Sequence, residues 1–294
     1  MNRIQHEQQR RNQQTRGCWE LYAEHRRQVT DLLVGHCPEG ARPLGGDVPT
    51  SRLCVLGAGN CNDLDLPQLL TRFGEIHLVD LDGDALSAGV GAQHLAADLR
   101  VGLHPGIDVT GLSGRLSNWS CDRPPPPAEI EAMLAVAAGE SPLPLEGPFD
   151  TVASVCLLSQ LLEPIKLALG ETHSCYLPLI QAVRARHLRQ VVNLCRPGGH
   201  LVLVTDFVSS DTCPELATVA DAQLSALAEQ LVLSQNFFTG LNPFLLRQMF
   251  ASDPWLTRRV MDARLSRPWR WHFPARFYAV CAVTAIRRQL DSGD

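Results

Sequence analysis

The chain has 294 residues, of which 45% are hydrophobic and 19% charged, and its 26 basic and 31 acidic side chains give a formal net charge of −5. This composition excludes a disordered polar chain, and the length is enough for a large core without disulfide or metal crosslinks. No apolar run approaches the roughly 18 residues that a membrane-spanning helix needs, and residues 1–17 lack the apolar stretch of a signal peptide. We therefore expect a cytoplasmic protein that does not associate with membranes.

Ten cysteines are present, but no two have the C-x-x-C spacing that is usual in zinc and redox sites. Several lie inside apolar segments, as Cys156 and Cys281 do. A buried free cysteine behaves as a small hydrophobic residue, so we expect reduced thiols in the core and predict no metal site.

The N-terminal part of the sequence alternates helical and strand patterns. Residues 18–34 carry apolar side chains at helical spacing, and a linker rich in Gly and Pro follows. Short continuous apolar runs come next, as expected for strands buried on both faces of a parallel sheet. The predicted strands cover 52–59, 75–82 and 101–111, and the predicted helices cover 64–73 and 83–98.

Residues 115–148 interrupt this alternation and hold seven of the 20 prolines. We interpret them as an insertion with a loop and one crossover helix. Later strands are predicted over 149–158, 200–208 and 276–288, with 269–273 as a further candidate, and later helices over 174–195 and 214–233. Strands that alternate with helices predict an α/β fold, doubly wound, with a ligand crevice at the carboxyl ends of the first strands.

Two glycines follow the first predicted strand directly. Gly57 and Gly59 let the backbone turn tightly and approach a ligand without a Cβ atom in the way. Asn62 occupies the third glycine position of the G-x-G-x-x-G nucleotide fingerprint, so this fingerprint is incomplete.

An acidic residue ends the second predicted strand. Asp80 comes 21 residues after Gly59, where a carboxylate can accept hydrogen bonds from both hydroxyls of a ribose. The structural alternative is a helix N-cap or a solvated turn. We favour the ribose role because of the upstream glycines, and we expect the neighbouring Asp82 to face solvent.

Five segments in this order resemble the class I S-adenosylmethionine-dependent methyltransferases. The resemblance covers roughly residues 50–210 and is carried by VLGAGNCND, HLVDLDGDAL, IDVTG, FDTVASVCLLSQLL and LCRPGGHLVLVTD. It implies a Rossmann-like, mostly parallel sheet of seven strands with helices on both faces, and S-adenosylmethionine as the cofactor. It also implies one methyltransferase domain over 1–294, divided into an N-terminal helical cap and linker (1–50), a cofactor-binding core (51–210) and C-terminal helices with closing strands (211–294).

The matching positions give an expected cofactor site. Its residues are Gly57, Gly59, Asn60, Asn62, Asp80, Leu81, Asp108, Val109, Ser154 and Val155. The fourth strand lacks the N/D-P-P-Y/F pattern of enzymes that methylate exocyclic base nitrogens, so such substrates are disfavoured.

The sequence gives fewer signals for the residues that would bind the methyl acceptor. His173 and Asp206 are candidate general bases, although a helix-start role for the first and a loop-capping role for the second are alternatives. Candidate substrate contacts are Trp19, Tyr22, Ser159, Gln160 and Phe237, for which core packing is the alternative.

We therefore predict in-line methyl transfer to O or N of a small-molecule acceptor, mainly by positioning and desolvation. The alternatives are a catalytically inactive cofactor-binding or interaction protein on the same fold, an NAD-dependent oxidoreductase and an aminopropyl transferase. The segment RPWRWHFPARF interleaves arginines with aromatic residues, but one short basic segment on an acidic chain disfavours nucleic acid as the partner. The sequence leaves the acceptor and the oligomeric state open.

Overall fold

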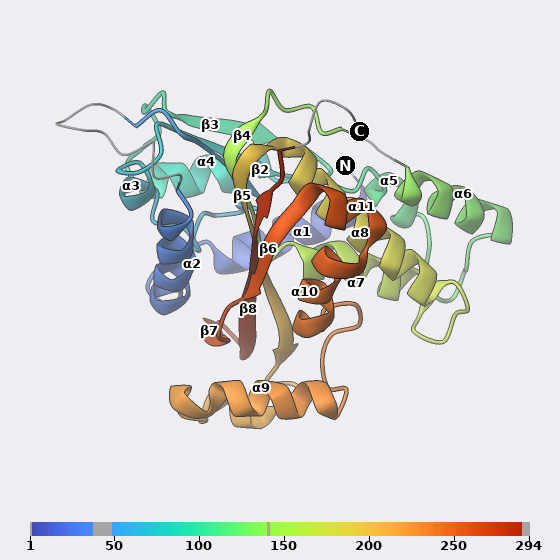
Figure 1. Cartoon of the computed structure of the whole chain (residues 1–294). Coiled ribbons are helices and arrows are strands. Elements are labelled where there is room, and N and C mark those ends of the chain that lie inside the picture. Colours follow the sequence, from blue (N-terminus) through green and yellow to red (C-terminus); the bar gives the residue numbers. More distant parts are fainter. Residues whose placement is uncertain (1, 38–48, 140–141, 290–294) are drawn as a thin grey trace.

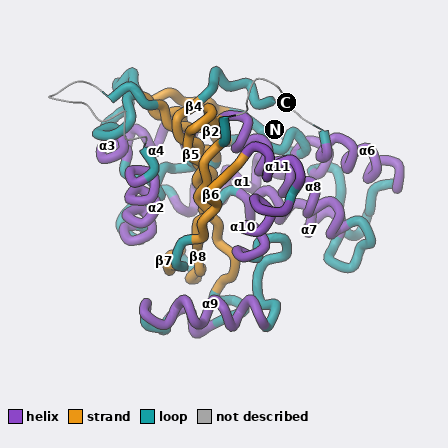
Figure 2. The backbone as a smooth tube through the Cα atoms, viewed as in Figure 1, coloured by secondary structure: helices purple, strands orange, loops and turns teal. Residues whose placement is uncertain are grey.

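The computed structural model describes residues 2–37, 49–139 and 142–289, and within them a single twisted sheet lies between two groups of helices (Figures 1 and 2). The strands of this sheet are β1 Arg52–Leu56, β2 Glu75–Asp80, β3 Val101–Pro105, β4 Phe149–Val155, β5 Cys195–Ser209, β6 Val260–Leu265, β7 Trp269–Phe273 and β8 Arg276–Arg287. Strands β1 to β5 are parallel, and β8 is antiparallel between β5 and β6.

The strand order is β3-β2-β1-β4-β5-β8-β6, with β7 paired to β8 alone. The main path therefore has the seven strands that were expected, and β7 adds an eighth. The order reverses between β1 and β4, and in open α/β sheets such a reversal leaves a crevice at the carboxyl ends of the two strands.

The helices are α1 Arg3–Thr15, α2 Ala23–Gly35, α3 Leu66–Leu69, α4 Gly83–Ala92, α5 Ser113–Leu116, α6 Pro127–Ala138, α7 Leu158–Leu169, α8 Tyr176–Leu194, α9 Leu224–Leu233, α10 Pro243–Ser252 and α11 Pro254–Arg259. Among the described residues, none of them has the length and apolarity needed to cross a bilayer. Helices α2, α3 and α4 cover one face of the sheet, and α6, α7, α8 and α10 cover the other (Figure 1). The doubly wound arrangement is thus confirmed.

Alternation along the strands builds the two cores. Cys54 and Leu56 of β1 join the cluster beneath α7 and α8, whereas Leu53 and Val55 join the cluster beneath α2 and α3. All four are completely buried, as a strand inside a parallel sheet requires.

Several predicted boundaries were wrong. The helix expected from Cys18 begins only at Ala23, and 64–73 holds a single helical turn. The helix expected over 214–233 consists of two 3-10 turns, Pro214–Ala217 and Asp221–Gln223, followed by α9. The expected R-P-G-G turn lies inside β5, where Gly198 has φ +74° and the pairing with β4 is irregular.

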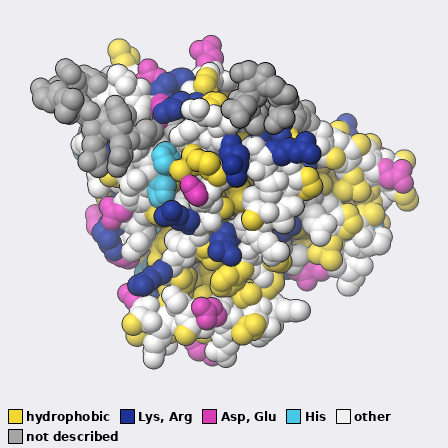
Figure 3. All heavy atoms as spheres, viewed as in Figure 1, with side chains coloured by type: hydrophobic (Ala, Val, Ile, Leu, Met, Phe, Trp, Pro, Cys, Tyr) yellow, Lys and Arg dark blue, Asp and Glu magenta, His cyan; other side chains and the backbone are white. Residues whose placement is uncertain are grey.

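The arginine-rich segment near the C-terminus forms the β7–β8 hairpin. Trp269 and Trp271 are buried, while Arg270 between them pairs with Asp221 at 2.9 Å. On the face seen in Figure 3, the Lys and Arg side chains are scattered among other residue types rather than joined in one patch. The alternation along β7 is that of an amphipathic strand.

Candidate functional site

A tight loop connects β1 to the next segment at the reversal of strand order. Gly57 and Gly59 have φ of +79° and +48°, the left-handed region that favours glycine. A Cβ atom on Gly57 would lie 2.8 Å from Cβ of Leu157, so this position also has no room for a side chain. Cys61 also has a left-handed backbone, at φ +55°. The G-x-G-x-x-G pattern puts its third glycine one residue later, at Asn62.

Asp80 ties this loop to the end of β2. Its Oδ2 accepts from the backbone N of Gly59 at 2.8 Å, and its Oδ1 accepts from the backbone N of Asp82 at 2.9 Å. Burial raises the pKa of Asp80 to about 6, and hydrogen bonds from the backbone of Asp82, Gly59 and Leu81 oppose that rise. A carboxylate can accept about four hydrogen bonds, so Asp80 keeps acceptor capacity for a ligand.

Asp82 was expected to face solvent, but it is buried. It is 4% exposed and caps α4, accepting from the backbone N of Asp84 and of Ala85 at 3.2 Å. Its other oxygen accepts from Nδ2 of Asn12 in α1 at 3.0 Å. The short acidic side chain is therefore used as an N-cap and as a contact for the N-terminal helix.

The structure brings six of the predicted site residues to one small cavity at the carboxyl ends of β1, β2 and β4. These are Gly57, Asp80, Leu81, Asp108, Val109 and Gln160. The cavity has a volume of about 60 Å³, and Ile4 and Gln8 of α1 form part of its wall. Gln160 is held in place because its Nε2 donates to the carbonyl of Cys156 at 2.9 Å.

Asp108 lines the cavity, but its carboxylate is engaged in the loop after β3. It accepts from the backbone N and the hydroxyl of Thr110, at 3.0 and 2.7 Å, and from the backbone N of Ser113 at 2.9 Å. These three bonds fix the turn that carries Val109 and Thr110 past the cavity.

The remaining predicted cofactor residues point elsewhere. Asn60 and Asn62 donate to the backbone of α1, at 2.6 Å to Asn12 and at 2.7 Å to Thr15. Ser154 is completely buried with its hydroxyl 2.7 Å from Nε2 of His187 in α8, and Val155 packs in the core cluster on the α2 side of the sheet. Gly59, Asn60, Asn62, Ser154 and Val155 are not among the cavity-lining residues.

A second polar cluster lies at the carboxyl ends of β4 and β5. Asp206, which is 5% exposed, accepts from the hydroxyl of Ser159 at 2.7 Å. Burial raises the pKa of Asp206 to about 6, and the bond from Ser159 opposes the rise. A carboxylate in this setting can take up a proton near neutral pH, as a general base must.

His25 of α2 belongs to the same region. Its Nδ1 accepts from the indole N–H of Trp269 at 3.0 Å, so the neutral ring carries its proton on Nε2. Nε2 lies 3.4 Å from Oδ1 of Asp63. Burial lowers the pKa of His25 to about 3 and raises that of Asp63 to about 7, so this contact joins a neutral imidazole and a carboxyl group and is not an ion pair.

The other acceptor-side candidates have structural contacts. Nδ1 of His173 accepts from the backbone N of Cys175 at 3.1 Å in the turn before α8. The ring of Trp19 lies 3.5 Å from the guanidinium of Arg26, and Phe237 packs against the core on the α7 and α8 side. Tyr22 is 3% exposed and meets Trp271 edge-on at 5.2 Å between ring centroids.

Sequence reasoning missed Gly89, which lets α4 pack against the glycine loop. A Cβ atom there would lie 2.2 Å from the carbonyl oxygen of Asn60. Gly89→Ala is therefore expected to lower the free energy of unfolding by about 1–3 kcal/mol, the usual cost of overpacking. Gly91→Ala on the same helix meets nothing within 4 Å and is the control, expected to leave stability unchanged or slightly raised. Denaturant unfolding of both variants checks this, and equal stabilities would contradict the contact.

No protein-family model matches the sequence, and no curated protein matches it. Among solved structures, human N-acetylserotonin methyltransferase in complex with its cofactor is similar at 13% identity and a TM-score of 0.46, over 96% of this chain and 57% of that one. The S-adenosylmethionine-dependent methyltransferase SibL is similar at 14% identity and 0.39, over 81% and 51%. Magnesium protoporphyrin IX methyltransferase from Synechocystis PCC 6803 is similar at 12% identity and 0.42, over 91% and 84%. The chain spans little more than half the length of the first two proteins.

The strand order indicates the fold. Five parallel strands reverse their order between β1 and β4, and the antiparallel β8 inserts between β5 and β6. A glycine loop follows β1, and an acidic residue that ends β2 holds it. The chain therefore has a doubly wound, Rossmann-like α/β fold.

Proposed function

We propose that the protein is an S-adenosylmethionine-dependent methyltransferase that acts on O or N of a small molecule. The observation that carries the proposal is the shared cavity of Gly57, Asp80, Leu81, Asp108 and Val109 at the reversal of strand order. Residues from the ends of three neighbouring strands and the loops after them converge there, where open α/β sheets bind ligands.

The chemistry of these residues suits the cofactor. The carboxylate of Asp80 would accept from the ribose hydroxyls, and Gly57 contributes only backbone to the cavity wall. Leu81, Ile107 and Val109 offer apolar contact for the adenine ring. The cavity of about 60 Å³ is smaller than the roughly 300 Å³ or more of typical ligand pockets, so the site has to widen on binding.

The cofactor would supply an activated methyl group, and the chain would supply alignment and exclusion of water. A neutral amine or a phenol needs little more than this. For a less acidic hydroxyl, the new bond to the methyl carbon forms as the sulfur–carbon bond breaks, and the hydroxyl proton has to leave. Asp206, held by Ser159 and with a pKa of about 6, is the acceptor that we propose for this proton, in preference to His173.

We further propose that the chain works as one domain in the cytoplasm. Strands β1 to β5 and β8 form one sheet, α2 and α8 pack against it, and α1 contacts α4 and α5. All ten cysteines are free, in keeping with a reducing compartment.

The test is methyl transfer from radiolabelled S-adenosylmethionine to a panel of small amines, phenols and alcohols. The proposal expects label in at least one acceptor class, and transfer to alcohols that falls below pH 6 as Asp206 becomes protonated. Binding of the cofactor with no transfer to any class would instead support the catalytically inactive alternative.

A further inference from the structure

Helix α1 lies directly on the glycine loop. Nδ2 of Asn60 donates to the carbonyl of Asn12 at 2.6 Å and to the hydroxyl of Thr15 at 3.1 Å. Nδ2 of Asn62 donates to the carbonyl of Thr15 at 2.7 Å. The last backbone carbonyl groups of a helix have no hydrogen-bond partner within that helix. Two side chains of the loop bind such carbonyl groups at the end of α1.

The helix also bridges the two sides of the crevice. On one side, Asn12 donates to Asp82 at the start of α4 at 3.0 Å. On the other side, Arg11 forms an ion pair of 2.5 Å with Glu163 of α7. Near the N-terminus, Arg3 donates to the carbonyl of Trp119 at 3.0 Å. Helix α1 is therefore fastened across the crevice at several points.

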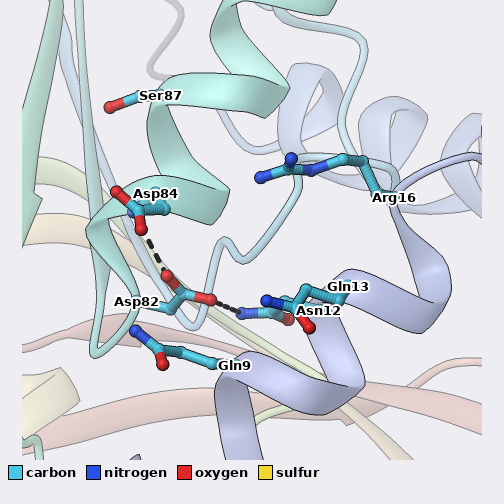
Figure 4. A pocket seen from close by; sticks show the side chains of 7 residues that line it. All are labelled: Gln9, Asn12, Gln13, Arg16, Asp82, Asp84 and Ser87. Carbon is cyan, nitrogen blue, oxygen red and sulfur yellow. Dashed lines mark hydrogen bonds between the residues drawn. The ribbon is translucent and has the colours of Figure 1, made fainter.

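A hollow lies on each side of α1. Ile4 and Gln8 form part of the wall of the small cavity that contains Gly57 and Asp80. Gln9, Asn12, Gln13 and Arg16 face an open pocket of about 400 Å³, opposite Asp82, Asp84 and Ser87 (Figure 4). Helix α1 and the contact between Asn12 and Asp82 separate the two hollows, so departure of the helix would join them into a groove of a size suited to a nucleoside ligand.

The contacts of α1 are almost entirely polar. Ile4 is its only large apolar residue within RIQHEQQRRNQQT. Polar contacts contribute little net stability because water replaces them when they break, and a helix of 13 residues is marginally stable alone. Helix α1 can therefore leave the crevice without exposing a large apolar surface.

We propose that α1 is a movable wall of the cofactor site, which leaves to admit S-adenosylmethionine and closes again over it. Ile4 and Gln8 then face the bound cofactor, and the hydrogen bond from Asn12 to Asp82 is the latch. This inference rests on the proposed function.

Hydrogen exchange of the full chain, alone and saturated with S-adenosylhomocysteine, tests the closure. The amides of α1 are expected to exchange faster than those of the buried α8 in the free protein, and at least tenfold more slowly once the ligand is bound. Unchanged exchange with ligand bound would show a static helix, and faster exchange would show a plug that the ligand expels; either result overturns the inference and leaves the proposed function standing. Failure to bind the ligand at all would overturn the proposed function itself.

A matched pair of variants tests the latch. Asn12→Ala removes the hydrogen bond to Asp82 and is expected to speed dissociation of S-adenosylhomocysteine about tenfold, as loss of a bond to a carboxylate does. Gln14→Ala, at an exposed position of the same helix that lines neither hollow, is expected to change this dissociation rate less than twofold. Stopped-flow displacement measures both rates. A dissociation rate for Asn12→Ala equal to that of the parent would contradict the latch, even where thermal stability falls.

Discussion

Asp80→Ala is expected to weaken binding of S-adenosylhomocysteine by roughly 1.5–3 kcal/mol, a loss of about tenfold to more than a hundredfold. The carboxylate would accept from the ribose hydroxyls, and hydrogen bonds to a charged group are worth more than neutral ones. The same carboxylate also holds the backbone N of Gly59 and of Asp82. Alanine would leave these buried donors without their acceptor, so the free energy of unfolding is expected to fall by a further few kcal/mol.

Calorimetric titration at a temperature well below the unfolding transition separates the two effects. Asp122→Ala is the control, because Asp122 is exposed and lines neither of the two hollows beside α1. If Asp80→Ala binds S-adenosylhomocysteine as tightly as the parent protein, the proposed placement of the cofactor is wrong.

Asp63→Asn is expected to stabilise the protein, and to do so by roughly 2–3 kcal/mol more at pH 8 than at pH 5. Burial raises the pKa of Asp63 from 3.8 to about 7, so the folded chain holds a proton that the unfolded chain releases. The stability that the protonated carboxyl gives is complete below pH 3.8 and is lost as the pH rises to about 7. Asparagine keeps the size of the side chain and an oxygen near His25, but has no charge to bury.

Denaturant unfolding of both proteins at pH 5 and pH 8 measures this difference. The exposed Asp84→Asn is the control, expected to show no such dependence on pH. A stabilisation by Asp63→Asn that is the same at both pH values would contradict the account of Asp63 as a buried carboxyl next to a neutral His25. Such a result would mean that the Asp63 carboxylate is charged at both pH values or is exposed to solvent.

The central parallel strands β1, β4 and β5 could be predicted because each is buried on both faces over most of its length. Because both faces of such a strand are buried, its sequence is a nearly continuous apolar run, as in LCVL and HLVLV. Glycines or acidic residues follow these runs. Gly57 and Asp80 were found for the same reason, since strand ends at the reversal of order form the site.

Helix α1 could not be predicted from periodicity. Its sequence is polar on every face, and it is held by an N-terminal capping box and by hydrogen bonds to Asn60 and Asn62, which lie far along the chain. Hydrophobic periodicity does not reveal polar contacts of this kind. The strand β6 was missed because only Val260 among its six residues is buried, so it has no continuous apolar run.

The directions in which individual side chains point could not be predicted from the sequence either. Ser154 sits at the end of β4 as expected, yet its hydroxyl meets His187 on the face covered by α8. Strand ends can be located from a pattern, but which face each side chain takes depends on strand register. The contact between His25 and Asp63 and the bond between Ser159 and Asp206 depend on the packing of α2, α7 and β5 and have no local signature.

The most direct test of the central claim is calorimetric titration of the full chain with S-adenosylhomocysteine, with NAD titrated in parallel. We expect micromolar binding of S-adenosylhomocysteine and no binding of NAD. Binding of NAD alone would favour the oxidoreductase, and binding of neither would contradict the assignment of the cavity around Gly57 and Asp80 as a cofactor site.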